Sequence, residues 1–453
     1  MNPDRTARIT FYNGMRTIGG THILISEGDS ALVFDLGLKY DPAENLSATD
    51  LPPVRETEAA LHVRTRNAPP VRGLFSGVHE QDLAWAAQGG DWPVTESFGH
   101  LAAFVSHAHQ DHMGLLQNVA AEVPVHVHED TRTLLGGLYQ GGLTPPPGAR
   151  LTGHPDGGQF AVGSMQATVL PGDHDLPGSA GLLVETGGGT VAYTGDWRRH
   201  GLHPQRMDAF IEACSSRGVD LLLTEGTRFG PAGQPARHPE PIPEGELPER
   251  LDHVLTQHAS GLVAVSFYPR NVERVAAFAA VAAAHGRQLA VHPETYALLQ
   301  GTCGLHSLDP ASVRVLSDHA DWQDVAADAS GYLTELRLED FPRLALCLSR
   351  PGGVFVHSDG SPLGEYDPAW SGMMAWLREL GMDYLPLRSG GHASPEDVRA
   401  LVAAIAPRLM VPIHSRYPES MLVRGVPVLL PQRGERFELG HLVSSGTSTV
   451  VLP

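Results

Sequence analysis

Three histidines and an aspartate lie within six positions in the segment 104–114, Phe-Val-Ser-His-Ala-His-Gln-Asp-His-Met-Gly. They follow the apolar run 101–105, which is typical of a buried strand. Imidazole and carboxylate ligands suit zinc, manganese or iron, and a catalytic ion keeps one position for water. Four such groups on one loop therefore predict two adjacent ions, and a chance cluster in a chain with 24 histidines is the alternative. The four residues are His107, His109, Asp111 and His112.

Other histidines and carboxylates also stand where an apolar run ends. The runs 31–34, 167–170, 191–194, 219–223 and 408–413 predict strands. The carboxylate that follows 31–34 could orient a ligand histidine. The carboxylate that follows 191–194 could bridge two ions through its two oxygens. Taken singly, each could instead be a turn aspartate or a hydrogen-bonded histidine at a strand end. The side chains are Asp35, His174, Asp196, Glu225 and His414.

His392 lies in the glycine-rich sequence Arg-Ser-Gly-Gly-His-Ala-Ser-Pro-Glu. Ser394 is a favoured N-cap and Pro395 a favoured first helical residue, so a helix is predicted to begin there. Free backbone amides at a helix N-terminus favour anions. We therefore expect Ser389 and Gly391 to contact an anionic substrate.

The composition describes an ordinary globular enzyme with room for two domains in its 453 residues. Three cysteines without a Cys-x-x-Cys pair predict neither a disulfide framework nor a thiolate zinc site, and they fit a reducing cytoplasm. No apolar stretch is long enough to span a bilayer, so no membrane association is expected. The net charge of −19 argues against a generic nucleic-acid binder. Bound cations and a locally basic groove would reduce the repulsion of phosphate.

Strands and helices alternate between residues 251 and 379, which predicts a second α/β domain with a parallel sheet. The apolar run 344–348 predicts one more strand, and the tail 432–453 alternates like terminal strands. Residues 40–99 are rich in proline, glycine and charge. They predict a long loop insertion with one helix at about 80–88.

Taken in order, these motifs resemble those of the metallo-β-lactamase fold with an inserted β-CASP domain. The four motifs of the metallo-β-lactamase fold resemble Asp35, the His-x-His-x-Asp-His loop, His174 and Asp196 of this sequence. The three further motifs of β-CASP proteins resemble Glu225, His392 and His414. The segments 19–37, 174–181, 193–196, 390–394 and 411–417 resemble ribonuclease J. The resemblance covers most of the chain, and the order of seven motifs is highly specific.

The resemblance implies an αββα sandwich with an inserted α/β domain, and it implies a role for each motif. Two divalent ions are expected, with zinc as the first choice and manganese as the alternative, and they would activate a shared water for attack on phosphorus. One ion would be held by His107, His109 and His174, and the other by Asp111, His112 and His414. Asp196 would bridge both ions, and Asp35 and Glu225 would be supporting carboxylates. His392 would contact the scissile phosphate or protonate the leaving oxygen.

Some features depart from ribonuclease J. Glu225-Gly-Thr replaces Asp-Ser-Thr, Asp359-Gly-Ser-Pro replaces a Gln-Gly-Glu-Pro-like loop, and the additional C-terminal domain is not expected here. A histidine at position 414 resembles the RNA-processing branch. Residues where the family lines its interdomain cleft are expected to contact RNA, namely Ser266, Arg270, Asn271 and Arg274.

These observations predict a metal-dependent ribonuclease that acts on single-stranded RNA, from a 5′ end or at internal sites. The first domain is expected to comprise 1–225 and 385–453, with the β-CASP domain at 226–384. A homodimer or larger homo-oligomer is among the expected assemblies. A hydrolase of DNA or of a small phosphoester or ester is one alternative. A non-catalytic subunit of an RNA-processing complex is the other, and it predicts eroded ligands, which this sequence does not have.

Overall fold

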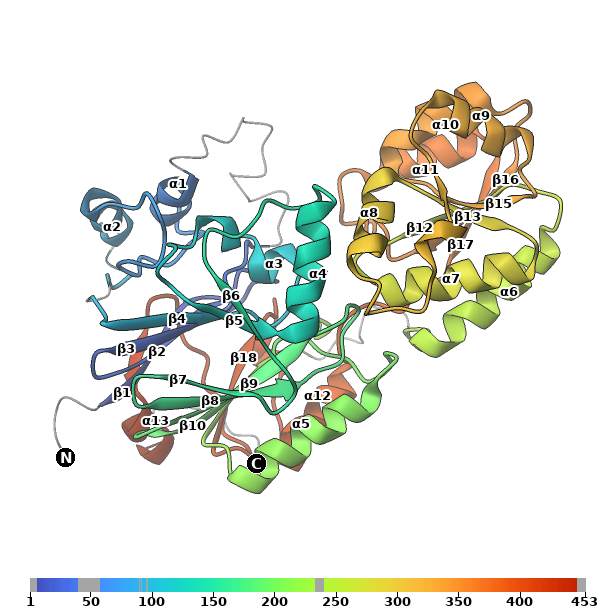
Figure 1. Cartoon of the computed structure of the whole chain (residues 1–453). Helices are drawn as coiled ribbons and strands as arrows, with labels where there is room; N and C mark the ends of the chain where they lie inside the picture. The colour runs from blue at the N-terminus through green and yellow to red at the C-terminus, as the bar shows by residue number, and fades with distance from the viewer. Residues whose placement is uncertain are drawn as a thin grey trace.

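The computed structural model describes residues 6–39, 58–88, 90, 92–94, 97–232 and 240–445, whose strands form three sheets. Two sheets face each other, and the third lies in a separate lobe (Figure 1). The first sheet has the order β19-β1-β2-β3-β4-β5-β6. Its strands are β1 Ala7–Asn13, β2 His22–Glu27, β3 Ser30–Phe34, β4 His100–Phe104, β5 Val125–His128, β6 Leu151–His154 and β19 Arg436–Glu438.

The second sheet, in the order β18-β11-β10-β9-β8-β7, packs on the first through a wholly apolar layer. Phe34 of the first sheet stacks on Tyr193 of the second with ring centroids 5.2 Å apart. Alternating apolar side chains on the facing strands make this layer, as expected for packed sheets. The strands are β7 Gln159–Val162, β8 Met165–Pro171, β9 Ala180–Thr186, β10 Gly189–Tyr193, β11 Leu221–Glu225 and β18 Leu409–Ile413.

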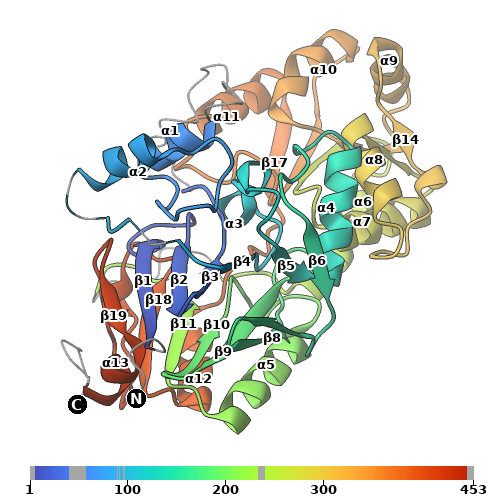
Figure 2. The same ribbon diagram turned by 60° about the vertical axis from the view of Figure 1, so that its left-hand side comes forward.

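Helices cover both outer faces of the sandwich (Figures 1 and 2). On the second sheet, α5 and α12 bury Phe210 and Leu401 against Leu222 and Met410. On the first, α1, α2 and α4 supply the apolar cover. This αββα layering is the predicted one. The helices are α1 Glu58–Arg64, α2 Glu80–Ala87, α3 Gln110–Met113, α4 Glu129–Gln140, α5 Pro204–Arg217, α12 Pro395–Ile405 and α13 Leu439–Ser445.

The third sheet is entirely parallel, with the order β14-β13-β15-β12-β16-β17, and helices lie on both of its faces. The predicted fold class, a sandwich with an inserted α/β domain, is therefore confirmed. None of the described helices has the length and apolarity needed to cross a membrane. The elements of this lobe are α6 Leu247–Gln257, β12 Val263–Phe267, α7 Val272–Ala284, β13 Gln288–Val291, α8 Pro293–Gly301, β14 Arg314–Val315, α9 His319–Ala327, β15 Tyr332–Glu335, α10 Phe341–Cys347, β16 Gly353–Ser358, α11 Trp370–Glu379 and β17 Met382–Pro386.

Three local predictions were wrong or incomplete. The run 344–348 is mostly helix, because Pro342 suits a first turn and the buried residues Phe341 and Leu344 repeat at helical spacing. In the tail, only β19 is a strand, since α13 follows it directly, and 446–453 lie outside the described residues. Within 40–99, α2 matches the predicted helix but α1 was not predicted, and 40–57 lie outside the described residues.

The topology explains why motifs far apart in sequence can meet. Strand β3 runs parallel to β4, and β10, β11 and β18 run parallel to one another. The carboxyl ends of parallel neighbours lie at the same edge of a sheet. The residues that follow these strands therefore meet at one edge of the sandwich, next to the third sheet's lobe.

Candidate metal centre

The loop 107–112 is fixed by the backbone that precedes β2 and the backbone that follows β3. The amides of Gly20, Leu36 and Leu38 donate to carbonyls of this loop over 2.8–3.1 Å. Gly37 permits the approach, because a Cβ at this position would lie 1.6 Å from the carbonyl oxygen of Asp111. Asp35 takes a left-handed conformation with a φ of 56°. Such a conformation at a non-glycine residue is characteristic of functional sites.

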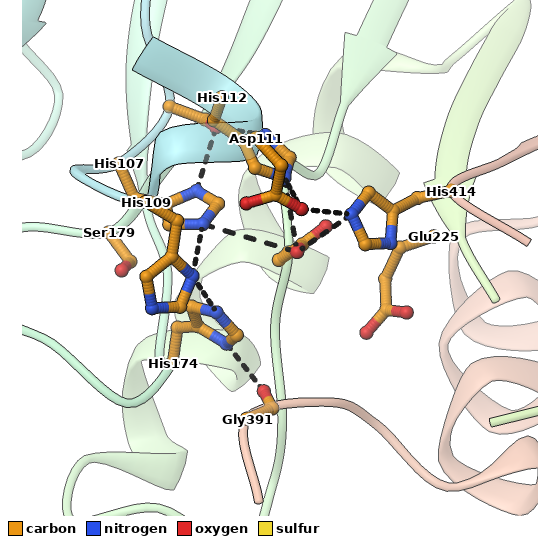
Figure 3. Close-up of polar contacts among 12 residues, drawn as sticks. His107, His109, Asp111, His112, His174, Ser179, Glu225, Gly391 and His414 are labelled. Carbon is orange, nitrogen blue, oxygen red and sulfur yellow. Dashed lines mark hydrogen bonds and ion pairs between the residues drawn. The ribbon is translucent and has the colours of Figure 1, made fainter. Parts of the chain in front are cut away.

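Three histidines present one nitrogen each to a common point. His107 Nε2 lies 3.0 Å from His109 Nδ1, which lies 3.2 Å from His174 Nε2 (Figure 3). Their potential ligand atoms all lie within 4.8 Å of one another. Three imidazoles with this spacing suit a divalent ion such as zinc.

A second group lies beside the first and contains both carboxylates predicted as ligands. His414 Nε2 lies 3.1 Å from Asp111 Oδ2, and it lies 3.4 Å from Asp196 Oδ2. The same oxygen of Asp196 is 3.2 Å from His112 Nε2 and 4.0 Å from His107 Nε2. Asp196 therefore lies between the two groups.

The outward nitrogens of four of these histidines have defined partners. His112 Nδ1 donates to Asp35 Oδ2 over 2.6 Å, and His174 Nδ1 donates to the Gly391 carbonyl over 2.5 Å. The remaining two contacts involve hydroxyl groups, with His107 Nδ1 3.0 Å from Ser106 Oγ and His414 Nδ1 2.7 Å from Thr227 Oγ1. Because both hydroxyls donate elsewhere, to Asp35 and to a backbone carbonyl, they can accept from the imidazoles. The inward nitrogens are then free to act as ligands.

Buried polar atoms without partners mark the space between the groups. Both carboxylate oxygens of Asp196 and Nε2 of His112 are buried and make no hydrogen bond. Asp196 itself is only 3% exposed. Buried polar groups are normally satisfied, and exceptions need a cause such as an ion. These atoms, together with the imidazole and carboxylate donors, fit divalent metal ions.

Burial and neighbouring charges shift the pKa values of the site in opposite directions. Burial and the neighbouring His112 and His109 hold the pKa of His107 well below its usual value, and burial lowers that of His174 to about 3. Both imidazoles are therefore neutral at pH 7, as metal binding requires. Burial acts against the charged form of His112, but Asp196 and Asp111 raise its pKa well above the usual value. A bound cation would favour the neutral form instead.

His392 and Glu225 complete a third group with His414. His392 Nδ1 lies 3.4 Å from Glu225 Oε1 and 3.6 Å from Asp196 Oδ2. Burial disfavours the charged imidazole, but the two carboxylates raise the pKa of His392 to about 9. Its side chain is 23% exposed, whereas that of Glu225 is fully buried. His392 can therefore carry a proton at the open side of the site.

Three of the residues predicted to contact RNA are buried in the second lobe. Asn271 and Arg274 are buried: Asn271 caps α7, and Arg274 is engaged by the carboxylates of Glu244 and Asp359. The sequence did not reveal these internal partners. Ser266 is also buried and packs against Gly360.

The other three predicted contacts also have hydrogen-bond partners inside the protein. Arg270 is buried and donates to the Ala108 carbonyl in the histidine loop. Ser389 is also buried, and its hydroxyl accepts from Arg198 over 3.2 Å. Gly391 accepts from His174 through its carbonyl. A Cβ at Gly391 would lie 2.5 Å from the His174 ring, so glycine allows this approach.

Comparisons with known proteins indicate which families this chain resembles. A family profile described as "Beta-lactamase superfamily domain" matches residues 86–241. Ribonuclease J of Thermus thermophilus is 25% identical over 375 residues, covering 74% of this chain and 62% of that protein. Ribonuclease J of Sinorhizobium meliloti is 23% identical over 342 residues, covering 69% of this chain and 57% of that protein. The chain is thus similar to ribonuclease J and, over residues 86–241, to the β-lactamase superfamily domain.

A solved structure shares this ribonuclease J-like architecture. It is the crystal structure of a protein of unknown function from Enterococcus faecalis V583, with a TM-score of 0.78 and 27% sequence identity. The alignment covers 95% of this chain and 99% of that one. It extends over both the sandwich and the third sheet, whereas this chain spans less than two thirds of the length of the two ribonuclease J proteins.

Several side chains of the site were not predicted. Ser106 and Thr227 stand one or two positions from predicted residues, and their proximity was the only signal for them. Tyr268 comes from the other lobe, and its ring centroid lies 5.2 Å from that of His109. No sequence pattern pairs residues across the two lobes, so this contact could be found only in the folded chain.

Proposed function

We propose that this protein is a metal-dependent ribonuclease that hydrolyses phosphodiester bonds of single-stranded RNA. The observation that carries the proposal is the arrangement of inward imidazole nitrogens around Asp196, whose buried oxygens lack hydrogen-bond partners. Such an arrangement is costly for folding unless cations occupy it. The names of the ribonuclease J relatives support RNA as the substrate class.

The proposed ligands fall into two groups that share one carboxylate. Zinc is the expected metal because imidazoles dominate, and manganese is the alternative. When bound, two such ions lower the pKa of a water and neutralise charge on the phosphoryl oxygens. The first group is His107, His109 and His174, the second is Asp111, His112 and His414, and Asp196 is shared.

The proposed proton donor is His392. Its Nδ1 faces Glu225 and Asp196, which keep the imidazole protonated, so the other ring nitrogen can give a proton to the leaving oxygen. Glu225 is itself fixed, because it accepts from the amides of Ala393 and Thr227. Asp35 accepts from Ser106, Tyr193 and His112 and holds the histidine loop in place.

The proposed domain division is 1–225 with 385–453 for the sandwich and 226–384 for the β-CASP domain. RNA would lie between the lobes, where Tyr268 and Arg270 of the second lobe contact the histidine loop. Cleavage from a 5′ end, cleavage at internal sites and a homodimeric assembly are further parts of the proposal.

Two observations favour a second candidate, a hydrolase of DNA or of a small phosphoester or ester. The net charge is −19, and two of the arginines predicted to bind RNA are engaged internally. A non-catalytic subunit is disfavoured, because every predicted ligand is present at the site.

Cleavage assays separate these candidates. The protein with Zn²⁺ or Mn²⁺ should shorten 5′-monophosphorylated single-stranded RNA, and His392→Ala should slow this by about 10²-fold or more. Asp173→Asn, a buried carboxylate on a neighbouring loop, is the matched control and should retain activity. Equal cleavage of DNA, or cleavage of a small diester alone, would select the second candidate. Bound metal without turnover of any of these substrates would select the non-catalytic role.

A further inference from the structure

His109 differs from the other histidines in the nitrogen that it turns inward. Its Nδ1 faces His107 and His174, at 3.0 and 3.2 Å, so its Nε2 points away from the proposed ion. An imidazole that binds a metal through Nδ1 carries its proton on Nε2. That proton needs an acceptor, because the side chain is only 17% exposed.

Asp175 supplies a carboxylate at the required place. Its Oδ1 lies 3.1 Å from His109 Nε2, and the Asp175 side chain is 14% exposed. The same atom is 3.3 Å from His174 Nε2, but His174 already uses Nδ1 as a donor and turns Nε2 inward. Oδ1 is buried and has no hydrogen bond of regular geometry within the described residues. Asp175 Oδ1 is thus placed to accept a hydrogen bond from His109 Nε2.

The surroundings keep this pair in place. The Tyr268 ring covers His109 from the other lobe, with centroids 5.2 Å apart. Asp175 follows His174 directly, so the backbone that places a proposed ligand also places this carboxylate. These contacts restrict the positions of both side chains.

We propose that Asp175 is a positioning residue that fixes the tautomer and ring orientation of His109 for metal binding. The inference rests on the metal centre of the proposed function but not on the substrate. It gives each ligand group one anionic acceptor, with Asp175 serving His109 of the first group and Asp35 serving His112 of the second. Outer acceptors of this kind raise ligand basicity, and their loss typically weakens metal binding about 10- to 100-fold.

Zinc titration of the full-length protein, without RNA, tests the proposal. Asp175→Ala should weaken one of two zinc-binding events by about 10- to 100-fold while two ions still bind at saturation. Asp175→Asn should restore most of the affinity, because an amide oxygen can accept from Nε2–H. Asp173→Asn is the matched control on the same loop, since this buried carboxylate packs against Gly201, and it should bind zinc normally.

Unfolding in excess chelator shows whether each variant still folds, and the additional stabilisation by zinc gives a second measure of affinity. Unchanged zinc affinity in Asp175→Ala would overturn the proposal. Complete loss of one ion in both Asp175 variants would also overturn it, because Asp175 would then be a direct ligand. Failure to cleave RNA would defeat the proposed function alone, since none of these readouts involves RNA.

Discussion

Two buried polar clusters hold the loop 389–392, and they are built in opposite ways. Around Asp196, both carboxylate oxygens and the facing Nε2 of His112 are buried and make no hydrogen bond. Around Arg274, the guanidinium donates to both oxygens of Glu244 over 2.6 Å and to Asp359 over 2.8 Å. Asp359 in turn accepts from the amides of Ser389 and Gly390.

This difference indicates which of the two clusters needs a bound ligand. A satisfied buried ion pair is complete in the chain alone, and removing one partner leaves an uncompensated charge. An unsatisfied cluster of imidazoles and carboxylates is complete only with cations. Substitutions in the Arg274 cluster should therefore reduce stability, and substitutions in the Asp196 cluster should reduce metal binding and activity.

The largest effect is expected at the shared carboxylate. Asp196→Ala should lower kcat/KM for RNA on the order of 10³-fold or more, because both proposed ions lose a ligand. Zinc content by mass spectrometry should fall in parallel. Retention of full activity and of two ions would remove Asp196 from the site.

Arg274→Met should lower the free energy of unfolding by about 3 kcal/mol, because the buried carboxylates of Glu244 and Asp359 lose their hydrogen bonds to Arg274 and keep only Arg198 and Arg388 as charged partners. Urea denaturation measures this loss, and zinc bound per folded chain should change little. Arg314→Met is the control: this arginine pairs with Asp321 but is 36% exposed, so about 1 kcal/mol or less is expected. Equal losses in both variants would contradict the comparison.

The ionic cluster should also weaken in acid. Burial disfavours the charged carboxylate, but Arg274 and Arg388 lower the pKa of Asp359 from 3.8 to about 2. The unfolded chain then takes up this proton first as the pH falls, so stability present above about pH 4 is lost toward pH 2. The difference in unfolding free energy between the protein and Asp359→Asn should shrink by about 2 kcal/mol between pH 5 and pH 2. A pH-independent difference would refute this.

The smallest effect is expected from Thr227→Ala, which removes the partner of His414 Nδ1. Zinc affinity should fall about tenfold, as for other outer partners of metal ligands. Thr133→Ala, which removes an exposed hydroxyl that donates to a helix carbonyl, should have no effect on zinc. Similar zinc affinities in the two variants would show that Thr227 does not orient His414.

The sequence predicted the fold class and the residues that converge, because parallel strands bring their carboxyl ends to one edge. The cap at Ser394 and the helix start at Pro395 were also predictable and are confirmed, since capping is local chemistry. The contact of Tyr268 with His109 and the internal partners of Arg274 depend on how the lobes pack. The prediction of a strand at 344–348 was wrong because five apolar residues fit a strand or a buried helix equally well.

Anomalous diffraction from zinc-soaked crystals of the full chain tests the central claim most directly. The account predicts two peaks, one among His107, His109 and His174 and one among Asp111, His112 and His414, both in contact with Asp196. A single peak elsewhere, or an ordered Asp196 without any ion beside it at saturating zinc, would contradict it.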